Sequence, residues 1–178
     1  MPIEQITQAA SLVVPEVILL GTMCVMFLAG PFLVTDAGTA APGLRHRWGA
    51  LSLIALAGAW FAWQSAGTEP VTGGPFRSDD LLWFVRGVTL TAGVALALLL
   101  WNQIDDGHAA EAHACLLAIL AGVNLTAAAN DLVMLFLALE LVSIPTYVLL
   151  YLPRRDAAMR EATLKHVRLS LFSPALLL

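Results

Sequence analysis

A glutamate lies near the middle of an almost entirely apolar stretch of the chain. The stretch, residues 130–152, reads NDLVMLFLALELVSIPTYVLLYL, and the acid is Glu140. Ser143 follows on the same face of a helix, and Pro145 lies two residues further on. The proline would leave the carbonyl of Leu141 without its helical N–H partner. A carboxyl group, a hydroxyl donor and a deformable backbone would together form a polar site that can take up and release a proton.

Other ionisable residues also fall in or beside apolar stretches. Glu16 follows Pro15, and a proline with an acid is a favourable start for a helix. The long side chain of Arg86 can either extend to the lipid headgroups or pair with a carboxylate on a neighbouring helix. Lys165 and Arg168 lie three residues apart, on one helical face at the start of the last apolar stretch. Each of them can anchor that helix at the headgroups or face inward.

An inward-facing lysine could approach Glu140 directly or through water. Each charge would then bias the affinity of the other group for protons, which is a physical basis for a gated proton step. His166, beside Lys165, titrates near neutral pH, although a single histidine at a membrane surface is more often inert. We therefore expect Glu140 and Lys165 to form a proton relay. Three residues are expected to support it: Ser143, Pro145 and Arg86.

The composition indicates a membrane protein. Of the 178 residues, 59% are hydrophobic and only 12% are charged. A soluble protein carries about 25% charged residues, so this chain has too little polar surface to cover a globule in water. A bilayer core of about 30 Å is crossed by about 20 helical residues. The sequence therefore predicts an all-α, polytopic transmembrane helix bundle, forming a single domain over residues 1–178. Five full spans and the start of a sixth are predicted at about 12–34, 48–66, 81–101, 113–129, 131–152 and 162–178.

The depth of Glu140 separates it from the other charged residues. It lies about 14 Å from one end of its predicted span and about 18 Å from the other, too far for a glutamate to reach the headgroups. An ionisable residue inside a span costs about 2.5–3.5 kcal/mol, so its presence favours a functional role.

The basic residues predict the orientation of the chain. Five of them lie in the first, third and fifth connections, whereas the N-terminus and the other connections contain only Arg77. Because basic residues favour the cytoplasmic side, we expect the N-terminus outside. The five are Arg45, Arg47, Arg154, Arg155 and Arg160.

Several functions are excluded by missing patterns. No phosphate-binding loop, dinucleotide-binding motif or hydrolase motif is present, and the basic residues are too few and too scattered for nucleic-acid binding. Cys24 and Cys115 lie in apolar stretches without a CxxC pattern, so neither a metal site nor a disulfide framework is expected.

Two segments of the chain resemble a known family. AAANDLVMLFLALELVSIPTYVLL and EATLKHVRLSLFSPALLL are similar to the membrane chain N of proton-pumping NADH–quinone oxidoreductase, respiratory complex I. VVPEVILL and DDLLWFVRGVTLTAG fall where that family has its Pro-Glu start and its basic residue. The Glu-Leu-x-Ser-x-Pro pattern, followed by Glu-Ala-x-Leu-Lys, favours chain N over its sister chains L and M. The resemblance covers the whole chain and is most specific in the fifth span.

The resemblance implies a larger bundle containing inverted repeats and broken helices. It implies that Glu140 is the key fifth-helix carboxylate and Lys165 a sixth-helix lysine. The chain would be a subunit of a translocase enzyme, inactive alone and without a cofactor; NADH, FMN, iron–sulfur clusters and quinone would be bound by partner subunits. Its partners would be the other membrane-arm subunits and the lipid bilayer. We expect a multi-pass protein of the cell inner (plasma) membrane.

The chain also departs from the family pattern. The broken seventh helix, whose lysine the family pairs with the fifth-helix carboxylate, has no counterpart within residues 1–178, and His166, Arg168 and Pro174 are unusual at their positions. We therefore expect an N-terminal portion or a truncated copy. Two alternatives to an oxidoreductase subunit remain: a subunit of a multi-chain cation/proton antiporter, and a truncated copy that transports nothing.

Overall fold

The computed structural model describes residues 12–33, 43–65 and 76–152. This part of the chain forms five α-helices and one short 3-10 helix, which confirms the all-α prediction. The α-helices are α2 (Val14–Ala29), α3 (Leu44–Ser65), α4 (Asp80–Leu100), α5 (Ala109–Ala128) and α6 (Leu132–Tyr151), and the 3-10 helix η1 (Pro31–Leu33) follows α2.

The helix ends differ from the predicted spans for identifiable reasons. Helix α2 stops before Pro31, because proline has no N–H with which to continue the helical ladder. Helix α5 starts four residues before the predicted span, within an alanine-rich segment that favours helix. Helix α3 also starts four residues early, with Arg45 and Arg47 in its first turn.

Four segments are long and apolar enough to cross a membrane: Val14–Leu33, Asp80–Leu100, Ala109–Ala128 and Leu132–Tyr151. Helix α3 has 22 residues but does not reach the same apolarity. The prediction of five full spans is therefore supported by composition for four of the five helices. The predicted sixth span lies outside the described residues.

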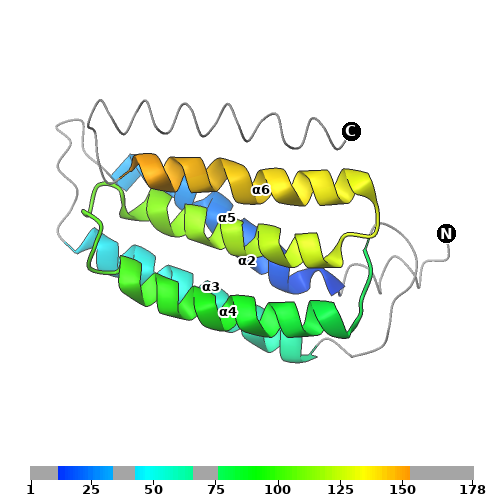
Figure 1. Ribbon diagram of the computed structural model, residues 1–178. Coiled ribbons are helices and arrows are strands. Elements are labelled where there is room, and N and C mark those ends of the chain that lie inside the picture. Colours follow the sequence, from blue (N-terminus) through cyan, green and yellow to red (C-terminus); the bar gives the residue numbers. More distant parts are fainter. Residues whose placement is uncertain (1–11, 34–42, 66–75, 153–178) are drawn as a thin grey trace.

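Helix α5 is the centre of the described bundle. It contacts each of α2, α3, α4 and α6, whereas α6 contacts only α5 among the described helices (Figure 1). Eight of the 20 residues of α5 are alanine, and small side chains let neighbouring helices approach closely. Most of α5 is consequently buried, whereas only Ala138 and Pro145 of α6 are buried.

Successive helices run in opposite directions, so the connections gather at two ends of the bundle (Figure 1). The α5–α6 turn and the starts of α2 and α4 lie at one end, which we call the outer end after the predicted orientation. The start of α3 and the α4–α5 connection lie at the other, which we call the inner end.

Two aspartates fix helix starts at the outer end. Asp79 accepts a hydrogen bond from the backbone N–H of Leu82 (2.9 Å), and Asp131 accepts one from Met134 (2.6 Å). Only residues 129–131 separate α5 from α6, so these two helices form a tight hairpin.

A third aspartate stabilises the start of α3 from a distant part of the chain. Asp106, in the α4–α5 connection, accepts hydrogen bonds from the backbone N–H groups of Arg45 (2.8 Å) and Gly43 (3.3 Å). These groups would otherwise be unpaired at a helix start. The bond from Arg45, with a smaller effect from Gly43, holds the pKa of the Asp106 carboxyl below its ordinary value.

We predict that Asp106→Ala lowers the thermal unfolding midpoint near pH 7 and that Asp106→Asn lowers it less, since an amide oxygen still accepts one bond. The folded-state pKa is depressed, so this stabilisation is present above the unfolded pKa of about 3.9 and is lost as pH falls through the folded value. The difference between wild type and Asp106→Ala should therefore shrink below pH 4. The exposed neighbour Asp105 provides the control; an equal effect of Asp105→Ala would contradict the capping role.

Candidate functional site

Glu140 lies near the middle of α6. It is about 12 Å from the start of the helix and about 16 Å from its end, and its side chain is half-buried. Within residues 12–33, 43–65 and 76–152, no hydrogen bond or ion pair is recorded for its carboxyl group. Glu140 is thus a mid-helix acid without a counter-charge in this part of the protein.

Glu140 lies on the face of α6 that is turned away from α5. The α5 contact is made by Ala138 and Val142, which flank Gly122 of α5. Successive helical residues are rotated by about 100°, so Glu140 is about 200° from Ala138 and 160° from Val142. It lines up instead with three exposed apolar side chains: Val133 (61%), Leu137 (55%) and Ile144 (55%). The acid therefore interrupts an uncovered apolar stripe.

The predicted hydrogen bond from Ser143 to Glu140 is absent from the structure. The Ser143 hydroxyl donates to the carbonyl of Leu139, one turn back in the same helix, at 2.8 Å. A serine in an apolar environment satisfies its hydroxyl locally in this way. Pro145 is buried and α6 continues through it, so the carbonyl of Leu141 lacks the N–H of residue 145, as predicted.

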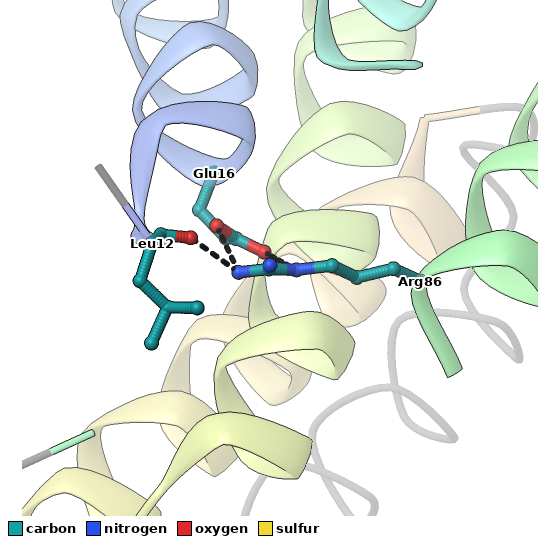
Figure 2. Close-up of polar contacts among 3 residues, drawn as sticks. All are labelled: Leu12, Glu16 and Arg86. Atoms are coloured by element: carbon teal, nitrogen blue, oxygen red, sulfur yellow. Dashed lines mark hydrogen bonds and ion pairs between the residues drawn. The ribbon is translucent and has the colours of Figure 1, made fainter. Parts of the chain in front are cut away.

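Arg86 pairs with Glu16. Its Nε and Nη2 donate to the two carboxylate oxygens at 2.8 and 2.9 Å, and Nη2 also donates to the carbonyl of Leu12 at 2.6 Å (Figure 2). Both side chains are buried, with 3% and 0% exposure. The interpretation that Arg86 extends to the headgroups is therefore wrong, and the alternative, a carboxylate on another helix, is the one observed.

The sequence contains a signal for this pair. Glu16 and Arg86 both lie near the starts of helices that begin at the outer end, so they are at similar depths. The expected role of Glu16 at the helix start is also confirmed, because Pro15 and Glu16 lie in the first turn of α2. The ion pair links α2 to α4, two helices whose backbones are not in close contact.

A second buried polar pair was missed altogether. His113 of α5 and Ser52 of α3 are both buried, with Nδ1 and Oγ 3.2 Å apart. The Ser52 hydroxyl donates its proton to the carbonyl of Gly49 at 2.7 Å, so its oxygen must accept from Nδ1–H of His113. This bond fixes the side of the imidazole that carries a proton.

The remaining predicted site residues, Lys165 together with His166 and Arg168, lie outside the described residues. In the described ranges, no three His, Cys, Asp or Glu side chains are grouped closely enough to hold a metal ion.

Comparisons with known proteins identify the family. The family described as "NADH:quinone oxidoreductase/Mrp antiporter, TM" matches residues 129–178, which include Glu140. NADH-quinone oxidoreductase subunit N 1 of Solibacter usitatus is 34% identical over 89% of this chain and 32% of the relative. Subunit N of Rhizorhabdus wittichii is 30% identical over 97% of this chain and 35% of the relative. NAD(P)H-quinone oxidoreductase subunit 2 of Trichormus variabilis is 32% identical over 71% of this chain and 24% of the relative.

This chain is homologous to NADH-quinone oxidoreductase subunit N and subunit 2. The predicted resemblance to chain N is thereby confirmed over most of the chain. The chain is a multi-pass membrane protein whose residues 129–178 match the NADH:quinone oxidoreductase/Mrp antiporter family. It spans about a third of the length of the subunit N relatives that it matches.

We predict that Glu16→Gln and Arg86→Gln each destabilise the protein by about 3–5 kcal/mol, because each leaves one buried charge without its partner. The double variant should lose clearly less free energy of unfolding than the two single variants lose together, since both charges are then absent. Equilibrium unfolding in detergent measures all three. Arg77→Gln, which removes an exposed ion pair with Asp79 (3.3 Å), should cost no more than about 1 kcal/mol. Additive losses from Glu16→Gln and Arg86→Gln would contradict the coupling.

We predict that Gly122→Ala loosens the attachment of α6. The added Cβ would lie 2.7 Å from Val142 Cγ2 and 3.0 Å from its backbone nitrogen. The backbone cannot move aside locally, so the helices must separate, at a cost of about 1–3 kcal/mol. Gly21→Ala in α2 is the control, because its Cβ would meet nothing within 4 Å. The unfolding midpoints should fall for Gly122→Ala only; equal midpoints in both variants would contradict close α5–α6 contact.

Proposed function

We propose that this chain forms part of a proton-translocating membrane subunit of an NADH–quinone oxidoreductase, with Glu140 as a mid-membrane proton carrier. One observation carries the proposal: a carboxyl group lies halfway along an apolar helix, on its uncovered face, with no counter-charge among the described residues.

The two membrane-embedded acids of the described bundle suit different tasks. Glu16 is held by two hydrogen bonds to one guanidinium, so its charge is already compensated. Among the described residues, Glu140 has no such fixed partner. Burying an unpaired carboxylate in a low-dielectric medium is costly, so its charge depends on a proton or on an approaching cation. That dependence makes Glu140 the better proton carrier.

Lys165 is the cation that we propose as the partner of Glu140 within this sequence. Approach of the ammonium group would favour the ionised carboxylate and release its proton, and withdrawal would favour uptake. Ser143 and Pro145 support the site indirectly, because the hydroxyl and the missing N–H both alter the helix ladder beside Glu140. Arg86, which is bound to Glu16, supports the position of α4 rather than the acid itself.

In this role the chain moves protons and carries out no redox step. NADH, FMN, iron–sulfur clusters and quinone would be bound by partner subunits, and the other membrane-arm subunits would surround this chain. The proposed location is the cell inner (plasma) membrane, with the N-terminus outside. The protein would thus be part of an enzyme through its assembly with those partners.

A cation/proton antiporter subunit is the second candidate, because the description of the matched family also names the Mrp antiporter. The relatives with oxidoreductase names favour the first candidate. Neighbouring genes distinguish the two: genes for further oxidoreductase subunits support the first, and an antiporter operon supports the second. Reading the gene past codon 178 tests whether the chain continues in frame or is a truncated copy that transports nothing.

We predict that Glu140→Gln in the complete protein lowers proton pumping coupled to NADH oxidation, because the amide cannot carry a proton. Glu140→Asp should keep part of the activity. Pumping is measured in inverted membrane vesicles with a pH-sensitive dye, relative to NADH oxidation. Asp80→Asn, an exposed acid at the start of α4, is the matched control. Unchanged pumping in Glu140→Gln would remove the relay role.

A further inference from the structure

An apolar groove lies at the inner end of the bundle. It has a volume of about 310 Å³ and is lined by Leu33 of η1 and by one face of α3 from Leu44 to Ile54. Arg47 is the charged residue among the lining side chains, and it is exposed. Within the described part of the chain, the groove therefore combines a hydrocarbon surface with one cationic group, that of Arg47.

The position of the groove matches the boundary between headgroups and hydrocarbon. Arg47 lies in the first turn of α3, and Ile54 lies seven residues, or about 10 Å, further along the helix. Large apolar side chains are exposed at both limits: Phe32 of η1 is 89% exposed and Ile54 is 67% exposed. Exposed apolar side chains are more stable in contact with lipid than with water, so we expect lipid to contact this surface.

The cationic end of the groove is fixed in place. Asp106 binds the backbone N–H groups at the start of α3, which orients the helical turn that carries Arg47. The carboxylate of Asp106 is occupied by Gly43 and Arg45, and it is not among the groups that line the groove. Among the described residues, an anion at the mouth of the groove would thus meet Arg47 and no lining carboxylate.

We propose that this groove binds an anionic phospholipid, with one acyl chain along α3 and the phosphate group at Arg47. Arginine presents several N–H donors suited to phosphate oxygens. The predicted orientation places Arg47 on the cytoplasmic side, where anionic lipids create a negative surface potential. The site is separate from Glu140 and does not depend on the proposed proton relay.

Native mass spectrometry tests the proposal. The full chain, purified in detergent in the assembly that it forms, is exposed to equal amounts of phosphatidylglycerol and phosphatidylcholine with identical acyl chains. Wild type should retain phosphatidylglycerol preferentially. Arg47→Gln should reduce that preference about fivefold, the effect of one basic residue near a membrane surface, and Arg47→Lys should largely keep it. Ala50→Phe, which fills the groove, should reduce retention of both lipids.

Arg45→Gln is the matched control. It removes the same charge two residues away, outside the groove lining, and keeps the backbone N–H that binds Asp106. Equal losses in Arg45→Gln and Arg47→Gln would indicate general electrostatic attraction and overturn the site. Unchanged retention in Ala50→Phe would show that another occupant, such as residues 34–42 of the chain itself, covers the groove. Circular dichroism of each variant should show that its helix content equals that of wild type.

Discussion

A buried charge in a membrane protein must be compensated, and the ion pair between Glu16 and Arg86 shows how this bundle meets that constraint. The guanidinium satisfies both carboxylate oxygens and the carbonyl of Leu12, so three acceptors at the outer end share one donor group. The backbones of α2 and α4 are not in close contact, so this pair joins them directly, while α3 and α5 pack against both helices. Glu140, in the same bundle, has no comparable partner among the described residues, and this difference is the basis of its proposed role as a proton carrier.

Helix α5 determines how closely the other described helices pack. Its small side chains let four helices approach one axis, and Gly122 brings the backbone of α6 within contact distance. This close contact sets the rotation of α6, since Ala138 and Val142 must face α5. Glu140 is then directed to the opposite face. The orientation of the proposed proton site thus follows from the absence of one side chain on the neighbouring helix.

The helices and the depth of Glu140 could be predicted from the sequence, because length and apolarity are local properties. Asp79 and Asp131 also set helix starts close to the expected positions through local hydrogen bonding, whereas Pro31 ends α2 at Ala29, before the predicted end at residue 34. The partners of polar groups could not be predicted in the same way. Ser143 was expected to bond to Glu140, but a carbonyl in its own helix competes more effectively. From the sequence, Arg86 could pair with either Glu16 or Glu140, and only the tertiary structure shows that it binds Glu16. The bond between Ser52 and His113 joins residues 61 positions apart, so no local sequence pattern predicts it.

The separation of Glu16 and Arg86 along the chain has a consequence for biosynthesis. Glu16 precedes Arg86 by 70 residues, so the ribosome delivers the acid to the membrane well before its partner. Until α4 emerges, the start of α2 carries an unneutralised group that is better accommodated at the headgroups than in hydrocarbon. An ionised Glu16 can therefore be buried beside its partner only after α4 has been synthesised.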